Sequence, residues 1–183
     1  YYGRTMADNM AITVANADVT LKAGFTTIRN VGDYFPEAIL EARKRIRAGK
    51  IPGPRIQTAG SYLTIPGGGG DLVVPGHDES EIPPGIRIGV ARGPEAFAAA
   101  TQQILDNGAD MIKIIASGAV FAFGGVPGAP EMTPAEIAAV VEVAHAAGVK
   151  VTAHAHGAQS IKDAILADVD SIEHASLGDD EAV

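Results

Sequence analysis

The chain has 183 residues, of which 46% are hydrophobic and 20% charged, a balance that fits a globular protein with a substantial core. Its net charge of −8 argues against a nucleic-acid partner, because phosphate binding needs clustered lysines and arginines, and no apolar run has transmembrane length. The absence of cysteine excludes disulfides, thiolate metal sites and a cysteine nucleophile. Because the chain begins with Tyr1, we expect residues upstream of it, and the compartment stays undecided.

A pattern of a helix followed by an apolar strand repeats along the chain. Each helix ends at a small residue followed by Gly or Asp, and the short apolar run that follows is typical of a strand buried on both faces. In chain order, this pattern predicts a helix carrying Met10, Val14, Ala17 and Leu21, helices that begin at Pro36, Pro94 and Pro134, a short helix over residues 157–166, and strands at residues 25–31, 55–60, 111–116, 149–154 and 169–174.

Alternating helices and strands predict parallel βαβ units and an α/β fold. A complete TIM barrel, (β/α)₈, has eight strands and about 250 residues, whereas this chain supplies about five strands. We therefore predict a single domain, residues 1–183, that forms the central part of a barrel. An open partial barrel exposes unpaired strand edges, which favours association into a homo-oligomer.

Polar residues occur at matching depth in the repeated units. Counted from the Gly or Asp that ends the preceding helix, Asn30, His154 and His174 each lie six residues on, and Lys113 lies five on. Equal depth places these side chains near one end of a parallel sheet, which is where barrels build their sites. A lone strand histidine is more often a core residue, but two at equal depth favour a metal site, and imidazole suits zinc, iron and nickel.

His156 lies two residues after His154, so both would point to one face of a regular strand. We expect the strand to end near His154, however, because Gly157 opens a turn. His154 is therefore predicted to be a metal ligand, and His156 to face the substrate or support a ligand. The alternative for His156 is a purely structural role at the start of the loop.

Lys113 is flanked by isoleucines, and burial of its ammonium group would be costly unless it were paired or chemically changed. It could pair with a carboxylate such as Asp110 or Glu173. It could form a Schiff base with a carbonyl substrate. Its neutral amine could also take up CO₂ to give a carbamate, an anionic ligand that can bridge two metal ions. The nearby histidines favour the carbamate.

Two Gly- and Pro-rich stretches, residues 65–92 and 121–130, directly follow predicted strands. Loops in this position carry the substrate site of a β/α barrel, and long loops in compact domains are often functional. The alternative is a mobile surface loop without a role in binding.

Five motifs together resemble the amidohydrolase superfamily, and in particular its imidazolonepropionase-like branch, which holds prolidases (Xaa-Pro dipeptidases), related carboxypeptidases and ochratoxin-type amide hydrolases. The motifs span nearly the whole chain: Ala23-Gly24-Phe25-Thr26-Thr27-Ile28-Arg29-Asn30-Val31-Gly32, Ile51-Pro52-Gly53-Pro54-Arg55, Met111-Ile112-Lys113-Ile114, Ala153-His154-Ala155-His156-Gly157 and Ser171-Ile172-Glu173-His174-Ala175-Ser176.

The resemblance implies a (β/α)₈ barrel beside a small β-sandwich, and a binuclear metal centre, usually zinc, bridged by a carbamylated lysine. It implies cleavage of an amide (C–N) bond by a metal-bound hydroxide, with dipeptides or N-acyl amino acids as small-molecule substrates. Carried over residue by residue, Lys113 matches the carbamylated lysine, and His154 and His174 match the metal ligands of strands five and six. The chain then corresponds to about strands 2–6 of the barrel.

The chain departs from the family pattern in three places. It has no counterpart of the His-x-His pair after strand one or of the aspartate on strand eight. Relatives often carry a Gly-Gly-His-x-Asp motif after strand three, whereas here Gly67 to Gly70 are followed by Asp71. Gly69 and Asp71 are therefore predicted to bind substrate through an altered contact.

Two other interpretations stay open. A Schiff-base lyase that uses Lys113 as its nucleophile would explain the buried lysine but leave the histidines without a role. Alternatively, the chain as given could be a non-catalytic barrel fragment, because about half of the family's metal ligands lie outside it. We expect the parent protein to be an enzyme and the isolated chain to be inactive.

Overall fold

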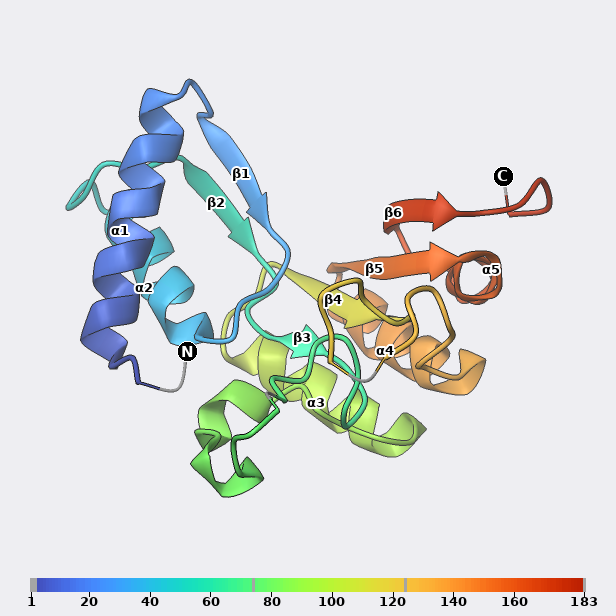
Figure 1. The fold of residues 1–183 in the computed structure, drawn as a ribbon. Helices are drawn as coiled ribbons and strands as arrows, with labels where there is room; N and C mark the ends of the chain where they lie inside the picture. The colour runs from blue at the N-terminus through green and yellow to red at the C-terminus, as the bar shows by residue number, and fades with distance from the viewer. Residues whose placement is uncertain (1–2, 74, 124, 183) are drawn as a thin grey trace.

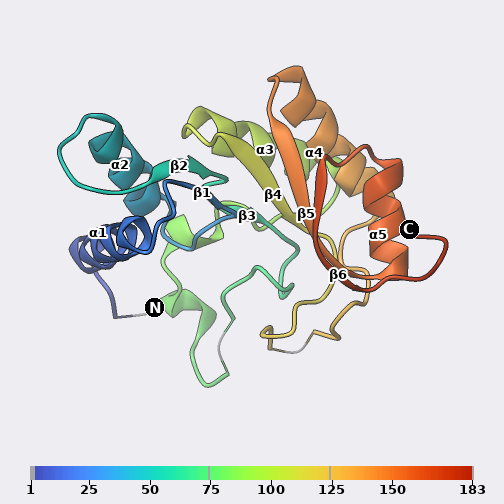
Figure 2. The ribbon, with the colours of Figure 1, turned by 90° about the horizontal axis from the view of Figure 1, so that it is seen from above.

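The computed structural model of the chain describes residues 3–73, 75–123 and 125–182. The fold is α/β, with parallel strands on the inside and helices in an arc around them (Figures 1 and 2). Within the described residues, no helix combines the length and the apolar character needed to cross a membrane.

The elements are α1 (Met6–Lys22), β1 (Thr27–Asn30), α2 (Pro36–Arg47), β2 (Arg55–Thr58), β3 (Tyr62–Leu63), the short 3₁₀ helices η1 (Glu79–Glu81) and η2 (Pro84–Arg87), α3 (Pro94–Asp106), β4 (Met111–Ile115), α4 (Pro134–Ala146), β5 (Lys150–Gly157), α5 (Ala158–Leu166) and β6 (Ser171–Leu177).

The strands form two parallel sheets, one in the order β1-β2 and the other in the order β3-β4-β5-β6. The five predicted strands all occur, but the prediction of one strand over residues 55–60 is wrong. That strand ends at Thr58, because Gly60 takes a left-handed backbone with φ 65° and its N–H donates to Thr58 Oγ1 at 3.0 Å. The chain then resumes as β3 in the other sheet.

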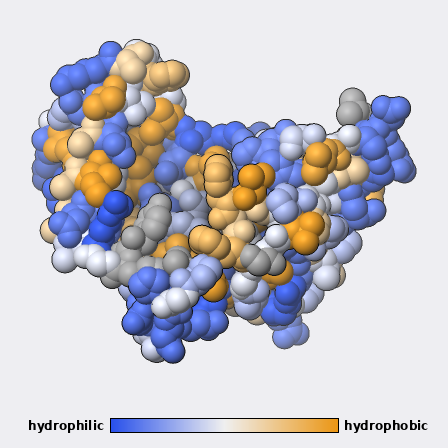
Figure 3. All heavy atoms as spheres, in the orientation of Figure 1, coloured by the Kyte–Doolittle hydropathy of each residue, from blue (hydrophilic) through white to orange (hydrophobic). Residues whose placement is uncertain are grey.

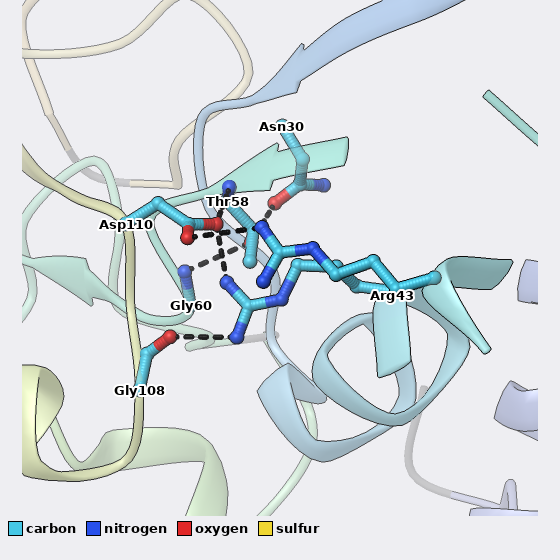
Figure 4. A network of polar contacts seen from close by, with 7 residues as sticks. Asn30, Arg43, Thr58, Gly60, Gly108 and Asp110 are labelled. Carbon is cyan, nitrogen blue, oxygen red and sulfur yellow. Dashed lines mark hydrogen bonds and ion pairs between the residues drawn. The ribbon is translucent and has the colours of Figure 1, made fainter. Parts of the chain in front are cut away.

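A polar network around Asp110 joins the two sheets (Figure 4). The Asp110 N–H donates to Thr58 O at 2.8 Å, and the Thr58 N–H donates back to Asp110 Oδ2 at 3.0 Å. Arg43 of α2 forms an ion pair with Asp110 and also donates to Gly108 O at 2.8 Å. Asn30 Oδ1 accepts a hydrogen bond from Thr58 Oγ1 at 2.8 Å, so Asn30 belongs to this network.

The main core lies between the four-stranded sheet and helices α3, α4 and α5. Every residue of β4 is buried, as expected for a central strand covered on both faces. The predicted start of α4 at Pro134 is confirmed, and a capping box fixes it, with reciprocal hydrogen bonds between Thr133 and Glu136. The fully buried large side chains of this core include Leu63, Phe97, Ile112, Ile114, Ile137, Val140 and Val151.

Candidate metal centre

Three histidines from β5 and β6 converge at one point. His154 and His156 lie on the same face of β5, and Ala155 between them pairs with His174 of β6. The potential ligand atoms of the three rings all lie within 4.8 Å of one another. The ring centroid of His154 lies 4.7 Å from that of His156 and 4.8 Å from that of His174. Such a cluster of nitrogen donors is suited to a transition-metal ion.

The cluster contains His156 because β5 is longer than predicted. The expectation that the strand ends near His154 is wrong: β5 continues to Gly157. The His156 N–H donates to Ser117 Oγ at 2.9 Å, and His156 Nδ1 lies 2.6 Å from Ser176 Oγ. Burial and the neighbouring charge of His174 lower the pKa of His156. Whether His156 faces a substrate stays a prediction.

His154 is the most enclosed ring of the three, with 7% of its surface exposed. Burial, followed by the charge of Lys113 and of the two other histidines, lowers the pKa of His154 to about 4. The ring is therefore neutral near pH 7, which is the form that binds metals. Its Nε2 atom is buried and has no hydrogen-bond partner within the described residues. A buried nitrogen without a partner is costly in a finished structure, so this atom fits a metal ligand.

His174 is exposed, and its backbone adopts the left-handed region with φ 79°, as does that of Ala175 with φ 50°. Such a conformation costs about 1–3 kcal/mol for a residue other than glycine and is concentrated at functional sites. The pairing of β5 with β6 also shifts register between Ala155 and Gly157. This irregular backbone presents the His174 ring to the rings of β5.

Lys113 lies on β4 beside the histidines and is only 3% exposed. Burial lowers its pKa to about 8, with the charge of Glu173 acting in the opposite direction and that of Arg29 in the same direction. The alternative in which Lys113 pairs with Asp110 does not occur, because Arg43 forms an ion pair with that carboxylate. Glu173 is bound by Arg29 Nη2 at 2.6 Å, so it is already engaged by another cation.

A cavity of about 430 Å³ opens at this cluster. Gly69 is in its lining, as expected for a substrate contact, and the predicted binding role of Gly69 remains a prediction. Asp71 is not in the lining: its Oδ2 accepts from Arg87 Nη2 at 2.5 Å and from the Gly67 N–H at 3.0 Å. Asn30, predicted at the same depth as the histidines, lies in the Asp110 network instead. The lining residues are Val31, Tyr34, Tyr62, Gly69, Gly70, Lys113, Ile115, Ala119, Val120, Phe121, His154, His156 and His174.

The apolar part of this lining was not predicted. Tyr34 and Tyr62 meet edge to face with their ring centroids 5.3 Å apart, and Val120 and Phe121 come from the loop between β4 and α4. The sequence signal was available, because bulky apolar residues stand in a loop that is otherwise rich in glycine. Long loops after barrel strands are the expected place for such residues.

Residues 7–181 match the amidohydrolase family, and the chain therefore belongs to this family. The parallel α/β fold matches part of TIM-barrel amidohydrolase structures.

Two named relatives make the comparison more specific. Ochratoxinase of Aspergillus niger is 31% identical over 172 residues, which are 88% of this chain and 35% of that protein. The crystal structure of a Xaa-Pro dipeptidase with bound methionine superposes with a TM-score of 0.87 and 39% identity, over 94% of this chain and 42% of that one. The crystal structure of A. niger ochratoxinase gives a TM-score of 0.83 and 29% identity, over 96% and 42% of the two chains. The chain thus spans well under half the length of these relatives.

Proposed function

We propose that the protein containing this chain is a metal-dependent hydrolase of amide bonds that acts on dipeptides or N-acyl amino acids. The observation that carries the proposal is the buried Nε2 atom of His154, which has no partner in the described residues and sits in a cluster of three imidazoles. Membership of the amidohydrolase family and similarity to a Xaa-Pro dipeptidase and an ochratoxinase support it. In this proposal the chain supplies about strands 2–6 of a (β/α)₈ barrel.

The residues present fit part of a binuclear zinc centre. His154 and His174 would hold one metal ion, and Lys113, as a carbamate, would bridge it to the second. Zinc in such a site lowers the pKa of bound water and polarises a carbonyl group.

The remaining roles fall to side chains of this chain. With its pKa lowered to about 8, the Lys113 amine is neutral in about a tenth of the molecules at pH 7, far more than an ordinary lysine, and the neutral amine is the form that reacts with CO₂. His156 is held between Ser117 and Ser176, and we assign it to the substrate side of the cavity. There its imidazole can donate a hydrogen bond that orients the substrate.

The test is hydrolysis of Xaa-Pro dipeptides and N-acyl amino acids by the protein, measured before and after treatment with a chelator and again after zinc is restored. We expect activity that follows the metal, and Lys113→Ala to be inactive but partly rescued by a short-chain carboxylate such as propionate. A carbon-13 carbamate signal in protein equilibrated with labelled bicarbonate should disappear in the same variant. Full activity of Lys113→Ala without added carboxylate would rule out the bridging role.

The Schiff-base alternative rests on the same buried amine, whose lowered pKa also suits a nucleophile. It assigns no role to the histidine cluster. Borohydride treatment in the presence of a keto substrate separates the two proposals: a stable adduct at Lys113 would support the lyase, and its absence would remove that alternative.

Light scattering of the purified chain would test the expected homo-oligomer.

A further inference from the structure

We infer that the cavity beside the metal centre selects amides that carry a large apolar side chain next to the scissile bond, and that Phe121 is the residue that sets this preference. The inference rests on the proposed function. It assigns a specificity role to the loop between β4 and α4, which has no part in the candidate metal ligation.

The first observation is the chemical character of the cavity walls. Apart from Lys113 and the three histidines, the lining side chains are aromatic, aliphatic or absent, and no carboxylate or arginine lines this cavity in the described part of the chain. Tyr34 and Tyr62 form an aromatic wall, and Val120 and Phe121 of the β4–α4 loop form a second, apolar wall. Lined in this way, the pocket favours an apolar side chain and disfavours a cationic one, which would lose its hydration without meeting a carboxylate in the lining.

The second observation is the exposure of the loop wall. Phe121 is 97% exposed and Val120 is 60% exposed. A phenylalanine left almost wholly in water forfeits the free energy that its burial would provide, and exposed apolar patches commonly mark binding sites. In Figure 3, apolar surface gathers in the middle of the view, over the loops that follow β3 and β4 in Figure 1.

The third observation is that backbone hydrogen bonds join the two ends of this loop, and that its first residues pack closely on Gly69. The Gly118 N–H donates to Ala129 O at 2.9 Å, and the Gly128 N–H donates to Gly118 O at 3.0 Å. A Cβ atom on Gly69 would lie 2.8 Å from Ala119 Cβ, so the glycine-rich loop packs directly beneath the segment that carries Phe121. Phe121, which lines the cavity, therefore follows closely on a segment that packs against Gly69.

The same glycine-rich loop is tied to the far end of the β4–α4 connection. The Gly69 N–H donates to Glu131 Oε2 at 2.9 Å, and burial raises the pKa of Glu131. This hydrogen bond connects the two long loops that line the cavity, so Gly69 is held relative to the loop that carries Val120 and Phe121. A side chain that enters beside the histidines would share this cavity with the tyrosine pair and with Phe121.

Phe123 provides a matched control. It lies in the same loop and is 59% exposed, but it is not in the cavity lining. Both substitutions, Phe121→Ala and Phe123→Ala, remove an exposed aromatic ring, so neither should affect folding, which circular dichroism would verify. The two variants differ in whether the lost ring faces the cavity.

The experiment measures binding and hydrolysis separately. Nuclear magnetic resonance titration of the metal-free protein would compare N-acetyl-L-phenylalanine with N-acetylglycine, and kcat/KM would be measured for dipeptides with phenylalanine or glycine beside the scissile bond. We expect Phe121→Ala to weaken the binding of N-acetyl-L-phenylalanine by about tenfold. It should also lower the ratio of kcat/KM for the phenylalanine dipeptide to that for the glycine dipeptide by about tenfold, mainly by raising KM for the phenylalanine substrate. Phe123→Ala should change neither.

The possible results separate this inference from the proposed function. Metal-dependent hydrolysis with an unchanged ratio in Phe121→Ala would overturn the inference and leave the function standing. Equal losses in both variants would overturn it as well. Phe121-dependent binding without hydrolysis of any amide would remove the function and support the apolar wall as a ligand site.

Discussion

The interior strands β4 and β5 and the edge strand β6 all contribute to the candidate metal centre, but they hold their side chains differently. Lys113 of β4 and His154 of β5 are 3% and 7% exposed, and burial is the main cause of the lowered pKa of each. His174 of β6 is exposed and depends on a left-handed backbone for its position. The difference shows two ways of preparing a ligand. Burial on an interior strand favours the neutral form of a side chain, whereas on the edge strand an unusual backbone conformation orients the ring.

The largest expected effect concerns the packing of the two regions. Ile114 of β4 is fully buried, so Ile114→Ala should lower the free energy of unfolding by about 2–5 kcal/mol through lost burial and the cavity left behind. Ile172 of β6 is only partly buried, and Ile172→Ala should cost less. Urea denaturation of the two variants measures both values, and equal losses would mean that β6 is as well packed as β4.

The second effect is the pH dependence of stability. The folded metal-free chain keeps His154 neutral down to about pH 4, whereas an unfolded histidine takes up its proton near pH 6.5. The unfolded state therefore binds more protons in this window, and stability falls as the pH drops from 6.5 toward 4, by up to about 3 kcal/mol from this group.

The variant His154→Gln isolates this contribution. Denaturation of the metal-free wild type and the variant between pH 4 and pH 7 should give a steeper loss for the wild type. Parallel pH profiles would show that His154 can charge without penalty, and the contrast between the interior and edge histidines would then be lost.

Much of this arrangement follows from local sequence rules. The five strands, the start of α4 at Pro134, and the position of Lys113, His154 and His174 beside one another could be predicted because apolar runs, turn residues and equal depth are properties of neighbouring residues. The split after Thr58 was not predictable, because it depends on the left-handed backbone of Gly60, which the sequence permits but does not require. The extension of β5 to Gly157 depends on pairing with β6, a contact between distant residues.

Contacts across the sheet explain the other differences. The sequence places Asn30 at the depth of the site and offers Asp110 as a partner for Lys113, but Thr58 and Arg43 bind them in the structure. The aromatic wall of Tyr34 and Tyr62 joins the loop between β1 and α2 to strand β3, two segments that are not neighbours in the sequence. Such partners depend on the geometry of the whole fold, and no spacing rule reveals them.

The third effect concerns His154 of the interior strand β5 and His174 of the edge strand β6 as metal ligands. We expect His154→Ala to weaken zinc or cobalt binding by more than about 100-fold, which exceeds the usual effect of removing a supporting group. The loss of metal affinity in His174→Ala should be smaller, because the His174 ring is exposed and therefore less fixed in position before the metal binds. Isothermal titration of the purified protein with each metal provides the measurement.

The control is His77→Ala, which removes an exposed histidine whose Nδ1 lies 2.9 Å from Glu81 Oε2, away from the cluster. It should leave metal affinity unchanged. If all three variants bound metal like the wild type, the cluster would not be a metal site. If His174→Ala were the weakest binder, the edge strand would supply the dominant ligand.

The smallest expected effect tests how the two outer strands are connected. Arg29 of β1 donates to Glu173 Oε1 of β6 at 2.6 Å and to Ser171 Oγ at 3.1 Å, and Thr152 Oγ1 also donates to Glu173 Oε1 at 2.7 Å. Because Arg29 is 42% exposed at its side chain, Glu173→Gln should lower the free energy of unfolding by no more than about 1 kcal/mol. The pKa of Glu173 is lowered by its hydrogen bond from Thr152 and by the charge of Arg29, against the effect of burial, so the loss should be seen at neutral pH and fade in acid. Glu181→Gln, which disrupts the exposed pair with Lys162, should have no measurable effect, and an equal loss in both variants would show that the β1–β6 contact is only a surface ion pair.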